Sequence, residues 1–145
     1  MAHITKLEVD ITTGDESQAD ANGPVYLGFG SREFRLNRPG VDDFKRNSNN
    51  TFILGDGSNV ANAAENDPRA FTIEADDVGK YDVYIRHDPP GDKKWLLRDV
   101  TVTATGPGIN YIYKVGNPVV GGGNIAAPGI WLGRDFGLIV YLQKQ

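Results

Sequence analysis

Residues Tyr81 to Thr103 read YDVYIRHDPPGDKKWLLRDVTVT, and this stretch decides the fold of the chain. Tyr81, Val83 and Ile85 alternate with Asp82, Tyr84 and Arg86, which is the period-two pattern of a β-strand with one buried face. The segment DPPGD at 88–92 then ends the strand, because proline fixes φ and lacks an N–H group while glycine accepts a positive φ. A second strand follows. The stretch therefore predicts a hairpin with a polar turn.

The second strand of this hairpin changes parity half-way along. Trp95 and Leu97 share one face, whereas Val100 and Val102 would fall on the opposite face of a regular strand. One extra residue at 98–99 would form a β-bulge and return the two valines to the side of Trp95. We therefore predict a bulge at this place and expect all four apolar side chains to enter one core.

The rest of the chain consists of short apolar runs separated by turn residues. Its 145 residues include 18 glycines and 8 prolines, a composition that favours many short strands in a single domain, residues 1–145. Further strands are predicted at 4–12, 24–29, 32–37, 51–54, 69–74, 110–115 and 138–142, with a helical turn in 60–65, a long loop at 116–129 and a short apolar anchor at 130–132. The leading architecture is an all-β antiparallel β-sandwich, and a closed barrel is the alternative.

Charge and composition narrow the classes of function. The formal net charge of −4 argues against nucleic acid as a partner and against anionic lipid held mainly by overall charge, and the absence of cysteine excludes disulfides and thiolate metal sites. No apolar run approaches the roughly 20 residues that span a bilayer, and the N-terminus lacks the pattern of a signal peptide. We expect a protein that is cytoplasmic, or exported without a classical signal peptide.

Several motifs, taken together and in this order, resemble the PLAT (lipoxygenase homology) domain, the β-sandwich of lipoxygenases, polycystins and α-toxin. They cover nearly the whole chain, and the most specific is a tryptophan followed by apolar residues at +2, +5 and +7, the parity change described above. The motifs are TGD at 13–15, VYL at 25–27 with FG at 29–30, DFKRNS at 43–48 leading to Phe52, VYIRHD at 83–88 and WLLRDVTV at 95–102.

The resemblance implies a sandwich of two four-stranded sheets and a non-catalytic module that docks on lipid surfaces or on protein partners, sometimes with Ca²⁺ bound in its loops. In the loops that the resemblance points to, the Ca²⁺ ligands would be Asp15, Asp20, Asn22, Asp42 and Asp43. Ca²⁺ takes about six to eight oxygen ligands, and carboxylates supply the charge for tight binding. The alternative is that these side chains are simply solvated, as Asp and Asn commonly are in turns.

Other candidate residues have simpler interpretations beside the functional ones. Trp95 and Trp131 are candidates for insertion into membranes, but we expect both in the core. The two histidines, His3 and His87, are too few and too distant for a zinc site, and no G-x-S-x-G nucleophile motif is present. A basic cluster, Lys93, Lys94 and Arg98, is either a solvated edge or a contact for an anionic headgroup or an acidic partner.

Three functions from different classes remain open, and an enzyme is the least favoured. The first hypothesis is a non-enzymatic module that binds a protein partner through its loops and one sheet edge. The second is a peripheral module that binds lipid with the help of Ca²⁺. The third is a carbohydrate-binding sandwich that uses exposed tyrosines such as Tyr84.

Overall fold

The computed structural model describes residues 2–115 and 129–145, so the loop predicted at 116–129 lies outside the described residues except for its last position. The described residues form nine β-strands and two short 3-10 helices. In chain order these are β1 (Lys6–Thr13), β2 (Val25–Phe29), β3 (Arg32–Arg35), β4 (Asn49–Gly55), η1 (Pro68–Phe71), η2 (Ala75–Lys80), β5 (Val83–His87), β6 (Lys94–Gly106), β7 (Ile109–Val115), β8 (Ile130–Gly133) and β9 (Ile139–Lys144). The all-β class is confirmed, and the anchor predicted at 130–132 is itself a strand.

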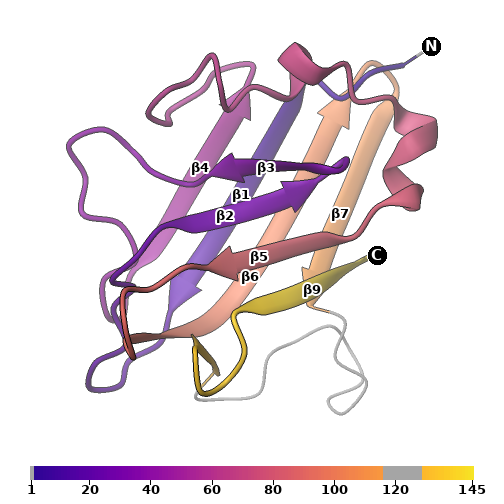
Figure 1. Ribbon diagram of the computed structural model, residues 1–145. Coiled ribbons are helices and arrows are strands. Elements are labelled where there is room, and N and C mark those ends of the chain that lie inside the picture. Colours follow the sequence, from indigo (N-terminus) through magenta and orange to yellow (C-terminus); the bar gives the residue numbers. More distant parts are fainter. Residues whose placement is uncertain (1, 116–128) are drawn as a thin grey trace.

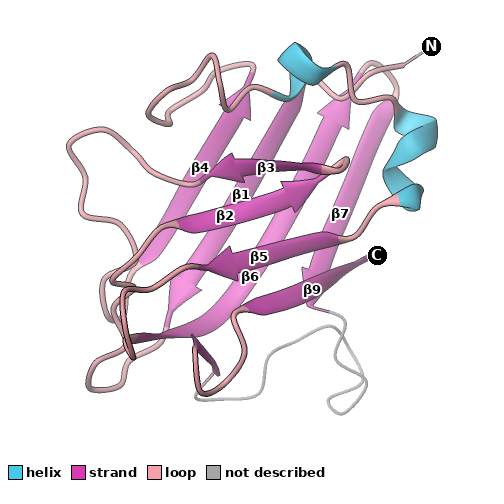
Figure 2. Ribbon diagram, viewed as in Figure 1, coloured by secondary structure: helices cyan, strands magenta, loops and turns pink. Residues whose placement is uncertain are grey.

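The strands lie in two layers (Figure 1). One layer has the order β4, β1, β6, β7 and the other the order β3, β2, β5, β9, and they are joined along one side where β7 pairs with β9. The strand path ends at β3 and β4 on the opposite side, so the sheet is an open antiparallel sandwich and not a closed barrel. Both helices lie in the connection between β4 and β5 (Figure 2).

The predicted hairpin at residues 81–103 is wrong in its pairing. The strand β5 pairs with β2 and β9, whereas β6 pairs with β1, β7 and β8. The turn DPPGD therefore carries the chain from one layer to the other. Two consecutive prolines cannot donate to a β-ladder, which stops β5 from continuing into a pair with β6.

The predicted bulge is confirmed. In the pairing of β1 with β6, Thr12 lies opposite Asp99 and Thr13 opposite Leu97, so one residue of β6 is left over. As a result Trp95, Leu97, Val100 and Val102 are all buried in the core between the layers.

The strand predicted at 69–74 is also wrong, because its first half belongs to the 3-10 helix η1. The side chain of Asp67 accepts a hydrogen bond from the N–H of Arg69 at 2.9 Å, and Pro68 stands at the first turn, so the local sequence caps a helix. Only Glu74 makes a β-bridge, to His3.

Side-chain amides cover both open edges of the sandwich. On β4, Asn59 Oδ1 accepts from the N–H of Ile53 at 2.7 Å, and its Nδ2 donates to the carbonyl of Thr51 at 2.9 Å. On β3, Asn66 Oδ1 accepts from the N–H of Arg35 at 2.7 Å. These contacts occupy backbone groups that would otherwise pair with another strand.

The substitution Asn59→Ala is expected to lower the free energy of unfolding by about 1 kcal/mol, since it removes two hydrogen bonds to the edge strand. It should also increase aggregation, because the freed edge is a template for strand pairing. Urea denaturation and light scattering measure the two effects. Asn59→Asp is the matched control, because it keeps the acceptor and loses the donor. An Asn59→Ala variant as stable and as monodisperse as the wild type would contradict the capping role.

Candidate functional site

Three loops meet at one end of the sandwich, the lower end in Figure 1. They connect β1 to β2, β5 to β6 and β8 to β9. Arg134 joins two of them, since its Nε donates to the carbonyl of Gly91 at 2.8 Å and its Nη2 to the carbonyl of Pro89 at 3.2 Å. We call this region the loop end.

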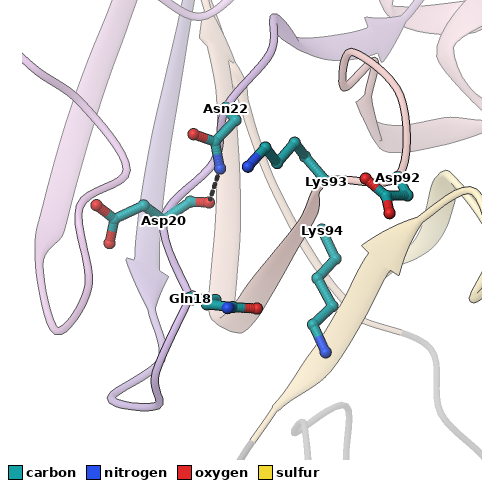
Figure 3. Close-up of a pocket in the computed structure, with 6 residues that line it drawn as sticks. All are labelled: Gln18, Asp20, Asn22, Asp92, Lys93 and Lys94. Carbon is teal, nitrogen blue, oxygen red and sulfur yellow. Dashed lines mark hydrogen bonds between the residues drawn. The ribbon is translucent and has the colours of Figure 1, made fainter.

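A cavity of about 500 Å³ lies at the loop end. It is lined by Gln18, Asp20, Asn22, Asp92, Lys93 and Lys94. Figure 3 shows side chains of the first loop and the two lysines around the same space. Two ammonium groups, two carboxylates and two amides line this cavity, so a polar ligand fits it better than an apolar one. Such a ligand would carry a positive and a negative group, or would be a phosphate held by the two lysines.

An aromatic pair adjoins this cavity on β8 and the loop that follows. Phe136 is 55% exposed, and Trp131 is half-buried. Lys94 Nζ lies 4.3 Å from the centroid of the Trp131 ring and 5.4 Å from that of Phe136. The loop end therefore presents two aromatic rings and a lysine together at its surface, an amphipathic combination typical of interfaces between water and lipid.

The prediction of a core position holds for Trp95 and is wrong for Trp131. Trp95 is fully buried, but Trp131 stands opposite Leu96 on the short strand β8, which covers only the beginning of β6. Leu132 is the residue of β8 that turns inward. Phe136 was not predicted as a site residue, and its only signal in the sequence is that a large apolar residue stands in the otherwise polar turn GRDFG.

The two-layer strand arrangement has close counterparts among solved structures. The α-toxin of Clostridium absonum matches 98% of this chain over 32% of its own length, with a TM-score of 0.61 and 22% identity. The α-toxin of Clostridium perfringens matches 97% of this chain over 31% of its length, with a TM-score of 0.57 and 17% identity. The chain has a PLAT-like β-sandwich fold.

A coral 8R-lipoxygenase matches 96% of this PLAT-like chain over 17% of its own length, with a TM-score of 0.56 and 14% identity. For that enzyme, calcium activation is ascribed to a C2-like domain. The chain spans a third or less of each of these proteins, so the likeness establishes the fold alone. No protein-family model and no curated protein matches the sequence.

The first three predicted Ca²⁺ ligands of the PLAT-like domain lie in one loop, where Arg46 holds two of them. Arg46 Nε donates to Asp15 Oδ1 at 2.9 Å, and the backbone N–H of Arg46 donates to Asp20 Oδ1. Asn22 Nδ2 donates to the carbonyl of Asp20 at 3.0 Å. A cation placed between these two carboxylates would have to displace the guanidinium of Arg46.

The other two predicted ligands belong to the loop before β4. Asp42 forms an exposed ion pair with Lys45 at 3.3 Å. The side chain of Asp43 is only 4% exposed and accepts from the Nε and the backbone N–H of Arg38 at 2.7 and 2.9 Å. Asp43 thus joins the two sides of the loop between β3 and β4 by binding Arg38, which is a structural role.

The five predicted ligands do not converge on one point. Asn22, Asp42 and Asp43 border a second hollow of about 330 Å³, whereas Asp20 and Asn22 border the first cavity. In the part of the chain that the structure describes, no three His, Cys, Asp or Glu side chains are grouped as metal ligands. As arranged, these residues do not fit a Ca²⁺ ion, which needs about six to eight oxygens with several carboxylates among them.

The fold places the two histidines far from each other, and it places Arg98 apart from the other two residues of the basic cluster. His87 is buried beside Trp95 with its Nδ1 2.9 Å from the carbonyl of Leu132, and His3 pairs with Glu74 at the other end of the molecule. Lys93 and Lys94 border the cavity, whereas Arg98 is the half-buried bulge residue of β6. Two of the three basic residues therefore belong to the loop end.

Proposed function

We propose that this PLAT-like domain is a non-catalytic module that docks on a phospholipid surface through its loop end. The observation that carries the proposal is the position of Lys94 over both Trp131 and exposed Phe136, beside the cavity that Lys93 borders. Aromatic rings bury favourably at the headgroup level, while lysines interact with lipid phosphates. The PLAT-like fold is consistent with a docking role.

The energy available from this surface suits reversible docking. Burying the exposed ring of Phe136 contributes roughly 1.5–3 kcal/mol. Each lysine close to an anionic surface adds about 1 kcal/mol. The sum of about 3.5–5 kcal/mol corresponds to a dissociation constant near the millimolar range. The acidic net charge of −4 opposes approach to an anionic membrane, so attraction has to come from the local lysines.

A protein partner is the competing function, through the loops and one sheet edge. Asn59 and Asn66 engage backbone groups on the edge strands β4 and β3, which disfavours the addition of a partner strand there. A protein could still contact the loops. Within the described residues no helix is long and apolar enough to cross a membrane.

Co-sedimentation with vesicles tests the proposal. The protein is centrifuged at low salt with vesicles of phosphatidylcholine alone or of phosphatidylcholine mixed with phosphatidylserine. Each vesicle type is tested once with Ca²⁺ and once with EGTA. We expect the wild type to pellet with the mixed vesicles in both conditions, because the lysines and aromatic rings need no metal. Lys94→Gln is expected to weaken the affinity for the vesicles about fivefold and Phe136→Ser about tenfold or more.

Tyr141→Ser is the matched control, since Tyr141 is also 55% exposed but lies on strand β9, away from the loops. It should pellet like the wild type. No pelleting under any condition would contradict the proposal and would make the binding of a protein partner the favoured function. Pelleting only with Ca²⁺ would mean that the metal replaces Arg46 as the partner of the Asp15 and Asp20 carboxylates. A stronger effect of Ca²⁺ in Arg46→Gln would then be expected, because that variant frees Asp15.

A further inference from the structure

The outer face of the layer β3, β2, β5, β9 carries an ordered aromatic surface that the proposed lipid contact does not use. The strand register aligns its residues in two rows. One row is Glu33, Gly28, Tyr84, Tyr141, and the next is Arg35, Tyr26, Arg86, Ile139. No described helix or loop lies across this face in Figure 1. We call these eight residues the tyrosine face.

Tyr84 lies across the strand beside it. A Cβ added to Gly28 would come within 2.0–2.5 Å of three atoms of the Tyr84 ring, so the ring occupies the space above this glycine. The hydroxyl of Tyr84 then reaches the next strand and donates to Glu33 Oε2 at 2.6 Å. Glycine inside a strand weakens the strand, and such a position commonly allows another group to approach closely.

The ring of Tyr84 is held in this position before any ligand arrives. Arg86 donates to both oxygens of Glu33 at 2.9 Å, and its guanidinium lies 4.3 Å from the centroid of the Tyr26 ring. Burial, together with the hydrogen bond to Glu33, raises the pKa of Tyr84 to about 12, so its hydroxyl stays protonated at physiological pH. A ring fixed at both ends loses little conformational entropy when a ligand stacks on it.

Tyr141 completes the shape of the surface. Its ring is 6.1 Å from that of Tyr84, is inclined to it by 67° and is 55% exposed. The two rings therefore make a floor and a side wall, both built on strands, which position side chains more precisely than loops do.

The polar groups around the rings indicate what the surface would bind. Glu33 and Arg86 neutralise each other, so neither an acidic nor a basic ligand is favoured at this point. The carboxylate of Glu33 accepts three hydrogen bonds of the about four that it can accept, and the Tyr84 oxygen keeps its acceptor capacity. Hydrogen-bond acceptors therefore border aromatic faces that carry negative partial charge.

A pyranose ring has the complementary chemistry. Its C–H face carries positive partial charge and stacks on an aromatic face, while its hydroxyl rim donates hydrogen bonds to acceptors beside that face. We propose that the tyrosine face binds an uncharged oligosaccharide, with one sugar ring stacked on Tyr84 and against Tyr141, one of its hydroxyls donating to the remaining acceptor position of Glu33 and another to the Tyr84 oxygen. This contact is independent of the loop end.

Calorimetric titration with neutral oligosaccharides of glucose, xylose, mannose and N-acetylglucosamine tests the proposal. The wild type is expected to bind at least one series with a dissociation constant in the micromolar to millimolar range, and Tyr84→Ala should weaken that binding about tenfold. Gly28→Ala keeps every aromatic residue but displaces the Tyr84 ring, and we expect it to melt cooperatively and to lose most of the sugar binding.

The controls separate this face from the loop end and from loss of folding. Tyr81→Ala removes a tyrosine that is 46% exposed and outside the tyrosine face, and it should bind sugar like the wild type. Phe136→Ser should also bind sugar normally. If Tyr84→Ala does not fold, the exposed Tyr141→Ala provides the same test. Failure of the wild type to bind any of the oligosaccharides would overturn the proposal, as would unchanged binding by Gly28→Ala and Tyr141→Ala.

Discussion

Replacing Trp95 with alanine is expected to lower the free energy of unfolding by about 3–5 kcal/mol, the largest effect of any single substitution considered for this protein. Trp95 is fully buried, and its ring lies 5.2 Å from that of Phe44 and 5.7 Å from that of His87. Its Nε1 donates to Thr13 Oγ1 at 3.0 Å. The substitution leaves a large cavity and deprives the buried Thr13 hydroxyl of this partner.

Thermal and urea denaturation measure this effect, and a drop of roughly 10 °C in the melting temperature is expected. Trp95→Phe is the graded control, because it keeps most of the packing and loses the hydrogen bond. Phe136→Ala removes an aromatic residue that is 55% exposed and should change the stability by less than about 0.5 kcal/mol. A Trp95→Ala variant no less stable than Phe136→Ala would mean that Trp95 does not hold the core together.

The second large effect is a loss of stability in mild acid caused by His87. Burial lowers the pKa of His87 below its ordinary value of 6.5. Its Nδ1 contacts the Leu132 carbonyl, and its buried Nε2 has no partner among the described residues, so a proton added there gains no acceptor. The folded state therefore binds this proton less readily than the unfolded chain does.

The sign of the pH effect follows from this difference. Above about pH 6.5 both states carry a neutral imidazole, and the stability does not depend on this group. Below that pH the unfolded chain takes up the proton first, so the free energy of unfolding decreases by up to about 1.4 kcal/mol per pH unit until the folded-state pKa is reached. Stability is thus lost as the pH falls.

Urea denaturation at a series of pH values between neutral and mildly acidic measures this slope. His87→Phe should flatten it, because the titrating group is gone while a ring of similar size still faces Trp95. Arg86 lowers the pKa of Glu33 and Arg69 lowers that of Asp67, chiefly through hydrogen bonds, but these carboxylates change stability only below about pH 4.5, so the loss of stability that begins just below pH 6.5 does not come from them. An equal slope in His87→Phe would assign the effect to another group.

The candidate sites illustrate which parts of a surface can be predicted from sequence. The alternation around Tyr84 correctly predicts that this side chain points away from the core, and the basic cluster correctly draws attention to Lys93 and Lys94. The partial exposure of Trp131 could not be foreseen, because it depends on the register in which β8 pairs with β6: Trp131 lies opposite Leu96, while Leu132 lies opposite Trp95 and is buried. Likewise, the five acidic and amide residues predicted as Ca²⁺ ligands give no sign in sequence that Arg38 and Arg46 engage three of them.

The sequence by itself determined which side chains are buried along most of the strands, with Trp131 on β8 as an exception, and it included the bulge in β6 that turns Val100 and Val102 to the side of Trp95. Burial on one face repeats every two residues, so it is a local property that a short stretch records. Only the tertiary structure decided that β5 and β6 belong to different layers and that Asp20 and Asn22 share a cavity with Lys93 and Lys94. Pairing partners and loop neighbours are chosen by packing between segments far apart in the chain, and no local pattern encodes that choice.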